Sequence, residues 1–162
     1  MTTFLTDTEH PEEPKAPPKS ARRRAREFAL QGLYQWRVGG ADEAAIEAQL
    51  PELDGFAKAD KEFCLATIRG VLAQHERLTA LVAAHIDRPF RELSPIESCV
   101  MLMGACELVH NPETPYRVII NEAIELTKAF GGTDGHKYVN GVLDKVAAEV
   151  RPAEVEAKKK GR

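Results

Sequence analysis

The sequence lacks most of the features that mark secreted, metal-binding or membrane-spanning proteins. Its three cysteines are odd in number and show no CxxC spacing, so they indicate neither a disulfide framework nor a zinc site. We expect Cys64, Cys99 and Cys106 to be buried thiols. No segment approaches the roughly 18 unbroken apolar residues of a membrane-spanning helix, and no apolar signal-peptide segment follows the first residues. The expected location is the cytoplasm, away from any membrane.

Motifs of catalysis are also absent. The five histidines are scattered, and the sequence contains no HExxH, GxSxG or GxGxxG pattern and no P-loop. No cysteine and histidine stand at a spacing that alone supports a nucleophile and its base. The sequence therefore predicts a binding protein rather than an enzyme, with no candidate catalytic or metal-ligating residue.

Strand patterns are missing too, because no sustained apolar-polar alternation is flanked by hairpin turns. Apolar residues instead recur with helical period, and four predicted helices follow good N-cap residues: Ser20, Asp42, Asp60 and Ser94. The last of these caps opens a capping box with Pro95 and Glu97, and its helix is apolar on most sides. We expect an all-α protein of about seven helices, packed as two three-helix subbundles that share one core.

The domain organisation follows from composition. Residues 1–19 hold four prolines among polar residues and are expected to be a disordered tail. Residues 20–150 form a single all-helical domain of common size. Residues 151–162 are rich in lysine and glutamate and are expected to be a basic disordered tail.

Four basic residues form a cluster at the predicted start of the first helix: Arg22, Arg23, Arg24 and Arg26. Cations near a helix N-terminus oppose the helix dipole, so the cluster calls for an external anion. Residues 20–40 carry a net charge of +4 and residues 41–150 carry −8, although the whole chain carries only −3. This asymmetry favours RNA as the partner of the arginines. The alternative is that the arginines are solvated surface charge.

The turn at residues 131–138 is a second candidate site. It combines two consecutive glycines, a helix start, Lys137 and Tyr138. Proteins commonly hold single-stranded RNA by stacking bases on aromatic rings while lysines and backbone amides bind the phosphates. The alternative is an ordinary turn between helices with Tyr138 half-buried.

Two blocks of residues carry a family pattern. One is residues 21–27 (Ala-Arg-Arg-Arg-Ala-Arg-Glu), followed by Leu33, Tyr34 and Trp36. The other runs from residue 115 to residue 144 and includes Asn-Glu-Ala-Ile-Glu-Leu at 121–126. With these blocks the chain resembles the bacterial transcription antitermination factor NusB family over about residues 21–150.

The resemblance implies an all-helical fold of two subbundles, without a cofactor and without catalysis. It implies that the protein binds the boxA segment of nascent RNA together with NusE, a ribosomal small-subunit protein. This complex would join RNA polymerase and other Nus factors and suppress premature termination, chiefly in ribosomal RNA operons. Because NusE is basic, the acidic middle region of the chain is an expected docking face.

The resemblance also assigns roles to individual residues. The RNA-contacting arginines of the family fall on Arg22 and Arg23 and, less directly, on Arg26. Its aromatic and acidic RNA-binding positions fall on Tyr138 and Asp134, and Lys137 lies between these two and completes the expected RNA-binding set. Tyr138 takes the stacking position, and a carboxylate at Asp134 can accept hydrogen bonds from base amino groups. An Asp at a helix N-cap is, however, already explained by capping. Tyr34 and Glu97 take positions linked to NusE.

Other functions stay open at this point. The main alternative is a helical protein-interaction adaptor without sequence-specific RNA binding, in which the arginines contact an acidic protein. A related helical domain also precedes the catalytic domain of ribosomal RNA cytosine methyltransferases, but 162 residues leave no room for such a domain. The sequence does not distinguish a monomer from a homodimer that pairs through its RNA face.

Overall fold

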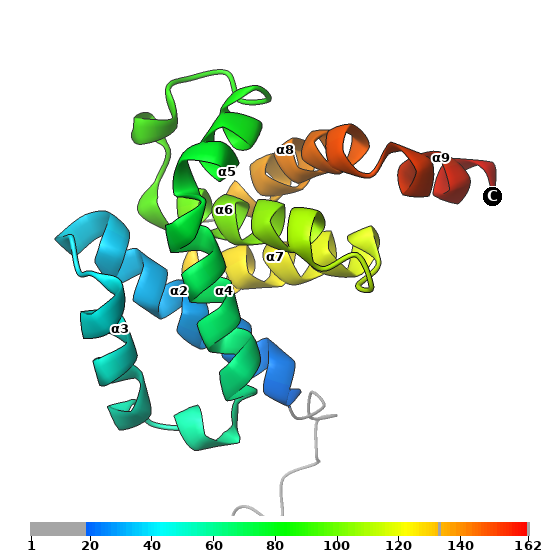
Figure 1. Ribbon diagram of the computed structural model, residues 1–162. Coiled ribbons are helices and arrows are strands. Elements are labelled where there is room, and N and C mark those ends of the chain that lie inside the picture. Colours follow the sequence, from blue (N-terminus) through cyan, green and yellow to red (C-terminus); the bar gives the residue numbers. More distant parts are fainter. Residues whose placement is uncertain (1–18, 133, 162) are drawn as a thin grey trace, which may run out of the picture.

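The computed structural model describes residues 19–132 and 134–161 of the chain. The predicted tail at residues 1–19 lies outside the described residues except for Lys19. Within the described ranges the chain forms helices and turns without a strand, which confirms the all-α prediction (Figure 1). The α-helices are α2 (Ala21–Gly39), α3 (Glu43–Gln49), α4 (Lys61–Ala73), α5 (His75–Ala83), α6 (Pro95–His110), α7 (Tyr116–Phe130), α8 (Gly135–Val150) and α9 (Pro152–Lys160). Three short 3-10 helices join them: η1 (Leu50–Glu52), η2 (Phe56–Lys58) and η3 (Phe90–Glu92).

Several helices begin at the N-cap residues that the sequence predicts. Ser20 Oγ accepts a hydrogen bond from the Arg23 N–H at 3.0 Å and starts α2. Asp42 and Asp60 cap α3 and α4 in the same way, through their carboxylates. Gly40 ends α2 at φ +73°, the left-handed conformation that favours glycine. Local side-chain chemistry therefore sets these helix boundaries.

Helix α6 is the centre of the fold. Its residues 98–108 are all buried, as the apolar composition on most sides predicts. Helices α2, α3 and α4 pack against one another, α7 and α8 pack against α6, and both groups contact α6 (Figure 1). The two predicted subbundles thus share one hydrophobic core. None of the described helices is long and apolar enough to cross a membrane.

The start of α6 forms half of the predicted capping box. Ser94 Oγ accepts a hydrogen bond from the Glu97 N–H at 3.1 Å. The Glu97 carboxylate, which a complete box would direct back to Ser94, lies beside Gly135 at the start of α8. A Cβ on Gly135 would stand 2.5 Å from Glu97 Oε2, so the glycine leaves the space that this carboxylate occupies.

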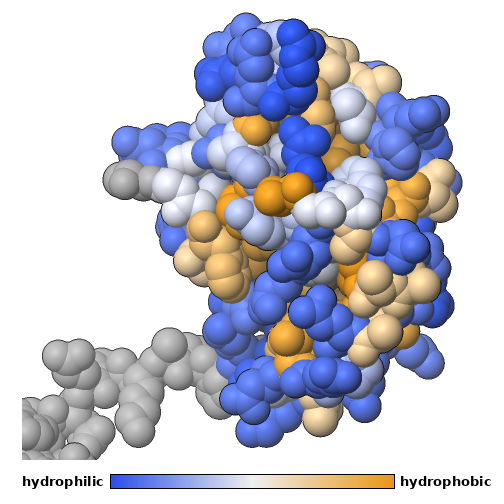
Figure 2. All heavy atoms as spheres, turned by 90° about the vertical axis from the view of Figure 1, so that its left-hand side faces the viewer, coloured by the Kyte–Doolittle hydropathy of each residue, from blue (hydrophilic) through white to orange (hydrophobic). Residues whose placement is uncertain are grey.

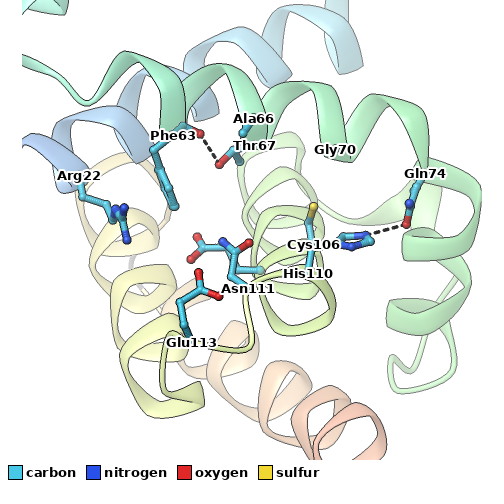
Figure 3. A pocket seen from close by; sticks show the side chains of 11 residues that line it. Arg22, Phe63, Ala66, Thr67, Gly70, Gln74, Cys106, His110, Asn111 and Glu113 are labelled. Carbon is cyan, nitrogen blue, oxygen red and sulfur yellow. Dashed lines mark hydrogen bonds between the residues drawn. The ribbon is translucent and has the colours of Figure 1, made fainter.

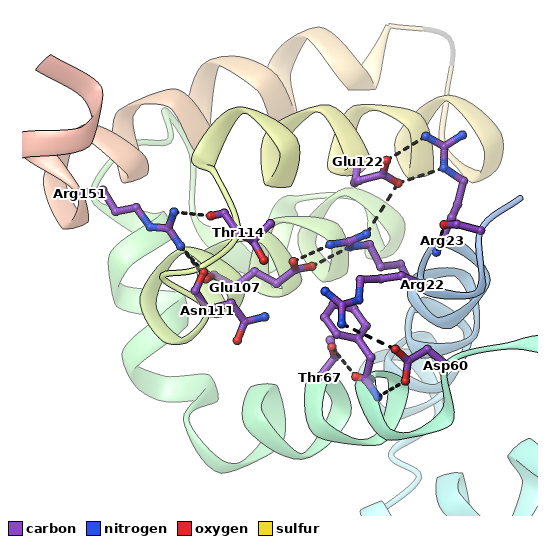
Figure 4. Close-up of polar contacts among 12 residues, drawn as sticks. Arg22, Arg23, Asp60, Thr67, Glu107, Asn111, Thr114, Glu122 and Arg151 are labelled. Atoms are coloured by element: carbon purple, nitrogen blue, oxygen red, sulfur yellow. Dashed lines mark hydrogen bonds and ion pairs between the residues drawn. The ribbon is translucent and has the colours of Figure 1, made fainter. Parts of the chain in front are cut away.

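The structure corrects the prediction of a disordered tail from residue 151, because residues 152–160 form helix α9. Arg151 anchors this helix. Its buried guanidinium donates to four backbone carbonyls at and after the end of α6, those of Glu107, Leu108, Asn111 and Thr114. Figure 4 shows Arg151 directed toward Asn111 and Thr114. Val155 is buried on the core side of α9. The described chain therefore has eight α-helices instead of the seven predicted.

Candidate nucleic-acid interface

Arg26 lies inside the protein. Its guanidinium forms two hydrogen bonds with the Glu107 carboxylate of α6, at 2.9 and 2.8 Å, and both side chains are only 5% exposed. Arg26 Nη1 also lies 3.9 Å from Glu122 Oε1 of α7. An arginine whose fork is filled by a buried carboxylate does not reach a ligand at the surface. The structure therefore corrects the assignment of Arg26 to direct RNA contact and places it at the junction of α2, α6 and α7.

Arg23 lies above this junction with its side chain 41% exposed. Its Nε and Nη2 donate to the two carboxylate oxygens of Glu122 at 3.0 and 2.8 Å (Figure 4). The hydrogen bond to Glu122 is the main cause that raises the pKa of the Arg23 guanidinium, so this cation stays charged.

Arg22 is the most accessible cation of the predicted RNA-contacting arginines, with its side chain 49% exposed. Its guanidinium stacks on Phe63 at 4.4 Å from the ring centre, and Nη2 lies 3.7 Å from Asp60 Oδ2. An exposed ion pair at this distance adds little stability. Arg22 also stands at one end of a groove of about 320 Å³ between α4 and the end of α6 (Figure 3).

These ion pairs give the arginine cluster a second explanation, within the protein itself. The dipole argument required an external anion, whereas Asp60, Glu107 and Glu122 place carboxylates of the same chain beside the arginines. The cluster by itself therefore does not identify a polyanionic partner. The parts of the cluster that an external polyanion can reach are the exposed portions of the Arg22 and Arg23 side chains.

Tyr138 lies half-buried near the start of α8 and is held by the loop after α5. Its hydroxyl donates to Asp87 Oδ1 at 2.9 Å, and the Arg88 guanidinium lies over its ring at 5.0 Å from the ring centre. Burial, followed by the hydrogen bond to Asp87, raises the pKa of the Tyr138 hydroxyl. The ring is therefore fixed in orientation, with Arg88 stacked on it.

A groove of about 450 Å³ runs beside Tyr138, between the end of α5 and α8. Lys137 and Lys145 line it together with Tyr138, so cations and an aromatic ring share one depression. The Asp134 side chain makes no capping hydrogen bond, although the residue occupies the N-cap position of α8. Its carboxylate lies 3.7 Å from Lys137 Nζ, and both side chains are about three-quarters exposed. Capping therefore does not use the Asp134 carboxylate, which is accessible to a ligand.

Tyr34 lies in a separate depression of about 320 Å³ where α2 meets the start of α6 and the end of α7. Ile96 and Phe130 line it too, and Phe130 is 42% exposed. Glu97 follows Ile96 directly, so the two residues predicted to meet a protein partner lie at the same end of the molecule. Figure 2 views the molecule from this end and shows apolar areas among hydrophilic surface.

Sequence reasoning missed Phe130 as an exposed residue and Ile96 as a partly exposed neighbour of Tyr34. Phe130 continues the helical apolar pattern of α7, so it reads as a core residue, and only its place in the last turn before Gly131 indicated exposure. A further depression of about 140 Å³ lies between α2 and α7, with Arg23 and Glu27 on one wall and Leu126 and Ala129 on the other. Arg22 and Tyr138, in contrast, line different depressions.

Comparison with known proteins gives one family. The model of the NusB family matches residues 23–148. The chain is 71% identical, over all 162 residues and 99% of the relative, to the transcription antitermination protein NusB of Dechloromonas aromatica (strain RCB).

Solved structures share the fold. NusB of T. maritima superposes with a TM-score of 0.72 at 29% identity, covering 88% of this chain and 99% of that one. A crystal structure of the antitermination factors NusB and NusE in complex with double-stranded RNA gives a TM-score of 0.69 at 19% identity, covering 80% and 97% of the two chains. At that identity the second likeness concerns the fold alone.

Proposed function

This chain belongs to the NusB family, and we propose that it is a transcription antitermination factor that binds the boxA segment of nascent RNA together with NusE. In this role it joins RNA polymerase and other Nus factors and helps the polymerase to resist termination. The observation that carries the proposal is the 71% identity, along the whole chain, to a transcription antitermination protein. Because bacterial transcription takes place in the cytoplasm, we also propose that the protein works there.

The RNA face consists of two parts in this proposal. Arg22 and Arg23 bind phosphates with their exposed donors, which supplies most of the affinity for a polyanion. Tyr138 stacks a base on its ring, and Lys137 binds an adjoining phosphate. The exposed Asp134 carboxylate accepts hydrogen bonds from base amino groups and so contributes to selectivity.

The NusE face is the end of the molecule that holds Tyr34 and Glu97. The exposed Phe130 ring and the neighbouring Ile96 supply apolar contact area, and the Glu97 carboxylate supplies negative charge toward a basic partner. Tyr34 lies on the same helix as Arg22 and Arg23, so α2 contributes to both faces.

Fluorescence-anisotropy titrations of a boxA-like RNA and a scrambled RNA, with and without NusE, test the proposal. Wild type should bind the boxA-like RNA selectively and more tightly with NusE, and an Arg22→Ala/Arg23→Ala variant should lose this binding. Arg69→Ala/Arg117→Ala is the matched control, because both arginines pair with surface carboxylates outside the proposed face. Equal, weak binding of both RNAs by wild type with NusE would contradict the proposal.

A second candidate function is a helical adaptor whose arginines bind an acidic protein surface. The Arg23–Glu122 pair favours it, since it shows a carboxylate filling the fork that a phosphate would use. Competition by RNA separates the two functions. An adaptor would retain its protein partner in the presence of RNA and would not need Tyr138.

A further inference from the structure

The cations of the proposed RNA face are paired with carboxylates of the same chain. Arg22 lies 3.7 Å from Asp60, Arg23 lies 2.8 Å from Glu122, and Lys137 lies 3.7 Å from Asp134. The two 3.7 Å pairs are loose contacts, partly exposed at Arg22 and largely exposed at Lys137, which water and salt screen. The pair between Arg23 and Glu122 is of a different kind.

Glu122 is fixed from two sides. Both of its carboxylate oxygens accept hydrogen bonds from Arg23, and Oε1 also lies 3.9 Å from the buried Arg26 (Figure 4). Arg26 is in turn held by Glu107, and the Glu122 side chain is only 18% exposed. Glu122 is therefore part of an ordered network that joins α2, α6 and α7, and it keeps the Arg23 guanidinium in one orientation.

The geometry leaves Arg23 able to contact RNA without leaving this network. A guanidinium has five N–H donors, and Glu122 accepts from Nε and Nη2, so Nη1 and the second Nη2 hydrogen are left over. The pair as a whole is close to neutral, so its attraction for distant phosphates is weaker than that of a free arginine. A phosphate is bound strongly by Arg23 only at short range, where it can accept hydrogen bonds from the remaining N–H donors.

We propose that Glu122 is a specificity-determining residue of the RNA face: it lowers the general attraction of Arg23 for polyanions while it holds the guanidinium in the orientation that the correct RNA requires. This inference rests on the proposed RNA-binding function and deepens it. Glu122 itself touches no RNA and acts through Arg23.

Glu122→Gln tests the inference, because it removes one charge and retains the side chain's shape. With NusE present, the affinity for a scrambled RNA should rise about two- to fivefold, while the affinity for a boxA-like RNA should rise less or fall. The salt dependence of scrambled-RNA binding should steepen by about 0.7 in slope, the value for one further phosphate neutralised on a single strand. Equal changes for both RNAs, or no change, would overturn the inference.

Glu47→Gln is the matched control. Glu47 forms the same kind of two-bond pair with Arg69, at 2.8 and 2.8 Å, between α3 and α4 and outside the proposed face. Loss of its charge should leave the ratio of the two RNA affinities unchanged. An equal loss of selectivity in this control would show a general charge effect and would overturn the role of Glu122.

Two further variants keep the inference testable if Glu122→Gln folds poorly beside the buried pair. Arg23→Lys retains the charge on the exposed side but cannot form the two-bond fork, and it should also reduce selectivity. In an Arg23→Gln background, Glu122→Gln should have no further effect on selectivity, since the two residues act as one unit. Wild-type selectivity in Arg23→Lys would overturn the inference while leaving the proposed function intact. Failure of wild type itself to discriminate between the RNAs would overturn both.

Discussion

At the scale of single residues, the buried pair of Arg26 and Glu107 is a structural element rather than part of the RNA face. Arg26→Ala leaves the Glu107 carboxylate buried without its partner, so we expect a loss of about 3–5 kcal/mol in the free energy of unfolding. Urea denaturation measures this loss. Arg69→Ala, which removes an exposed paired arginine, should cost about 1 kcal/mol or less.

The apolar double variant Arg26→Met/Glu107→Leu sharpens this test. Replacing both charges with side chains of similar volume should recover most of the stability lost in Arg26→Ala. If Arg26→Ala instead kept wild-type stability and lost RNA binding, this result would contradict the structural role and would indicate that Arg26 contacts RNA.

The three cysteines make a second residue-scale prediction. Burial raises the pKa of Cys64 and Cys99 to about 12 and that of Cys106 to about 11, from 9.0. Thiolates are therefore scarce in the folded protein, and a thiol reagent at pH 8 should label the fully buried Cys64 and Cys99 only as fast as the protein opens. Cys106, which borders the groove beside Arg22, should react slowly because its pKa is raised. All three thiols should react at once in denaturant. Rapid labelling of a native thiol would contradict the burial of that residue.

The same thiols link stability to pH. Their pKa values are higher in the folded than in the unfolded state, so below pH 9 both states hold the proton and stability is unaffected. Between about pH 9 and pH 12 the unfolded state loses protons that the folded state retains, and the thiols therefore lower the stability as the pH rises. Urea midpoints at pH 8 and pH 10 should show this fall, and a triple Cys→Ala variant should show less of it.

At the scale of helices, the sequence predicts the local capping interactions that start helices but not the ion pairs between helices that are far apart in the chain. Ser20, Asp42 and Asp60 cap the helices that follow them, and each uses a backbone N–H three residues away. Arg26 finds its partner 81 residues away, and Arg23 finds its partner 99 residues away. No sequence pattern specifies such pairs, which explains why the arginines were all assigned to one surface while the structure divides them between core and surface.

Helix α9 was missed for the same reason. Its composition is that of a soluble tail, and its order comes from Arg151, which binds four carbonyls around the end of α6. Arg151→Ala should release α9 and lower stability by about 1–3 kcal/mol, because these acceptors lose their donor. Hydrogen exchange of the α9 amides reports the release directly. Lys158→Ala, an exposed change in the same helix, is the control, and unchanged α9 protection in Arg151→Ala would contradict the anchoring role.

At the scale of the whole molecule, α2 joins the two proposed faces. Arg23 and Tyr34 stand eleven positions apart on this one helix, about 16 Å along its axis at 1.5 Å per residue. The helix packs against both α4 and α6, so it positions both side chains relative to one core. In the proposed function, binding of RNA and binding of NusE are coupled because both ligands contact this one rigid helix, and such a coupling must be reciprocal.

This arrangement predicts that substitutions at the two ends of α2 affect different ligands: those at the start affect RNA binding, and those near the end affect NusE binding. Tyr34→Ala should weaken NusE binding about 5- to 30-fold, and with it the enhancement of RNA binding by NusE, while the affinity for RNA alone stays unchanged. Arg22→Ala/Arg23→Ala should weaken RNA binding with and without NusE and leave the binding of NusE alone unchanged. Arg69→Ala, an exposed change on α4 outside both proposed faces, should alter neither affinity. Tyr34→Ala would contradict this arrangement if it reduced the affinity for RNA alone as much as the arginine variant does. Tyr34 would then belong to the same binding face as the arginines, and α2 would carry one face instead of two.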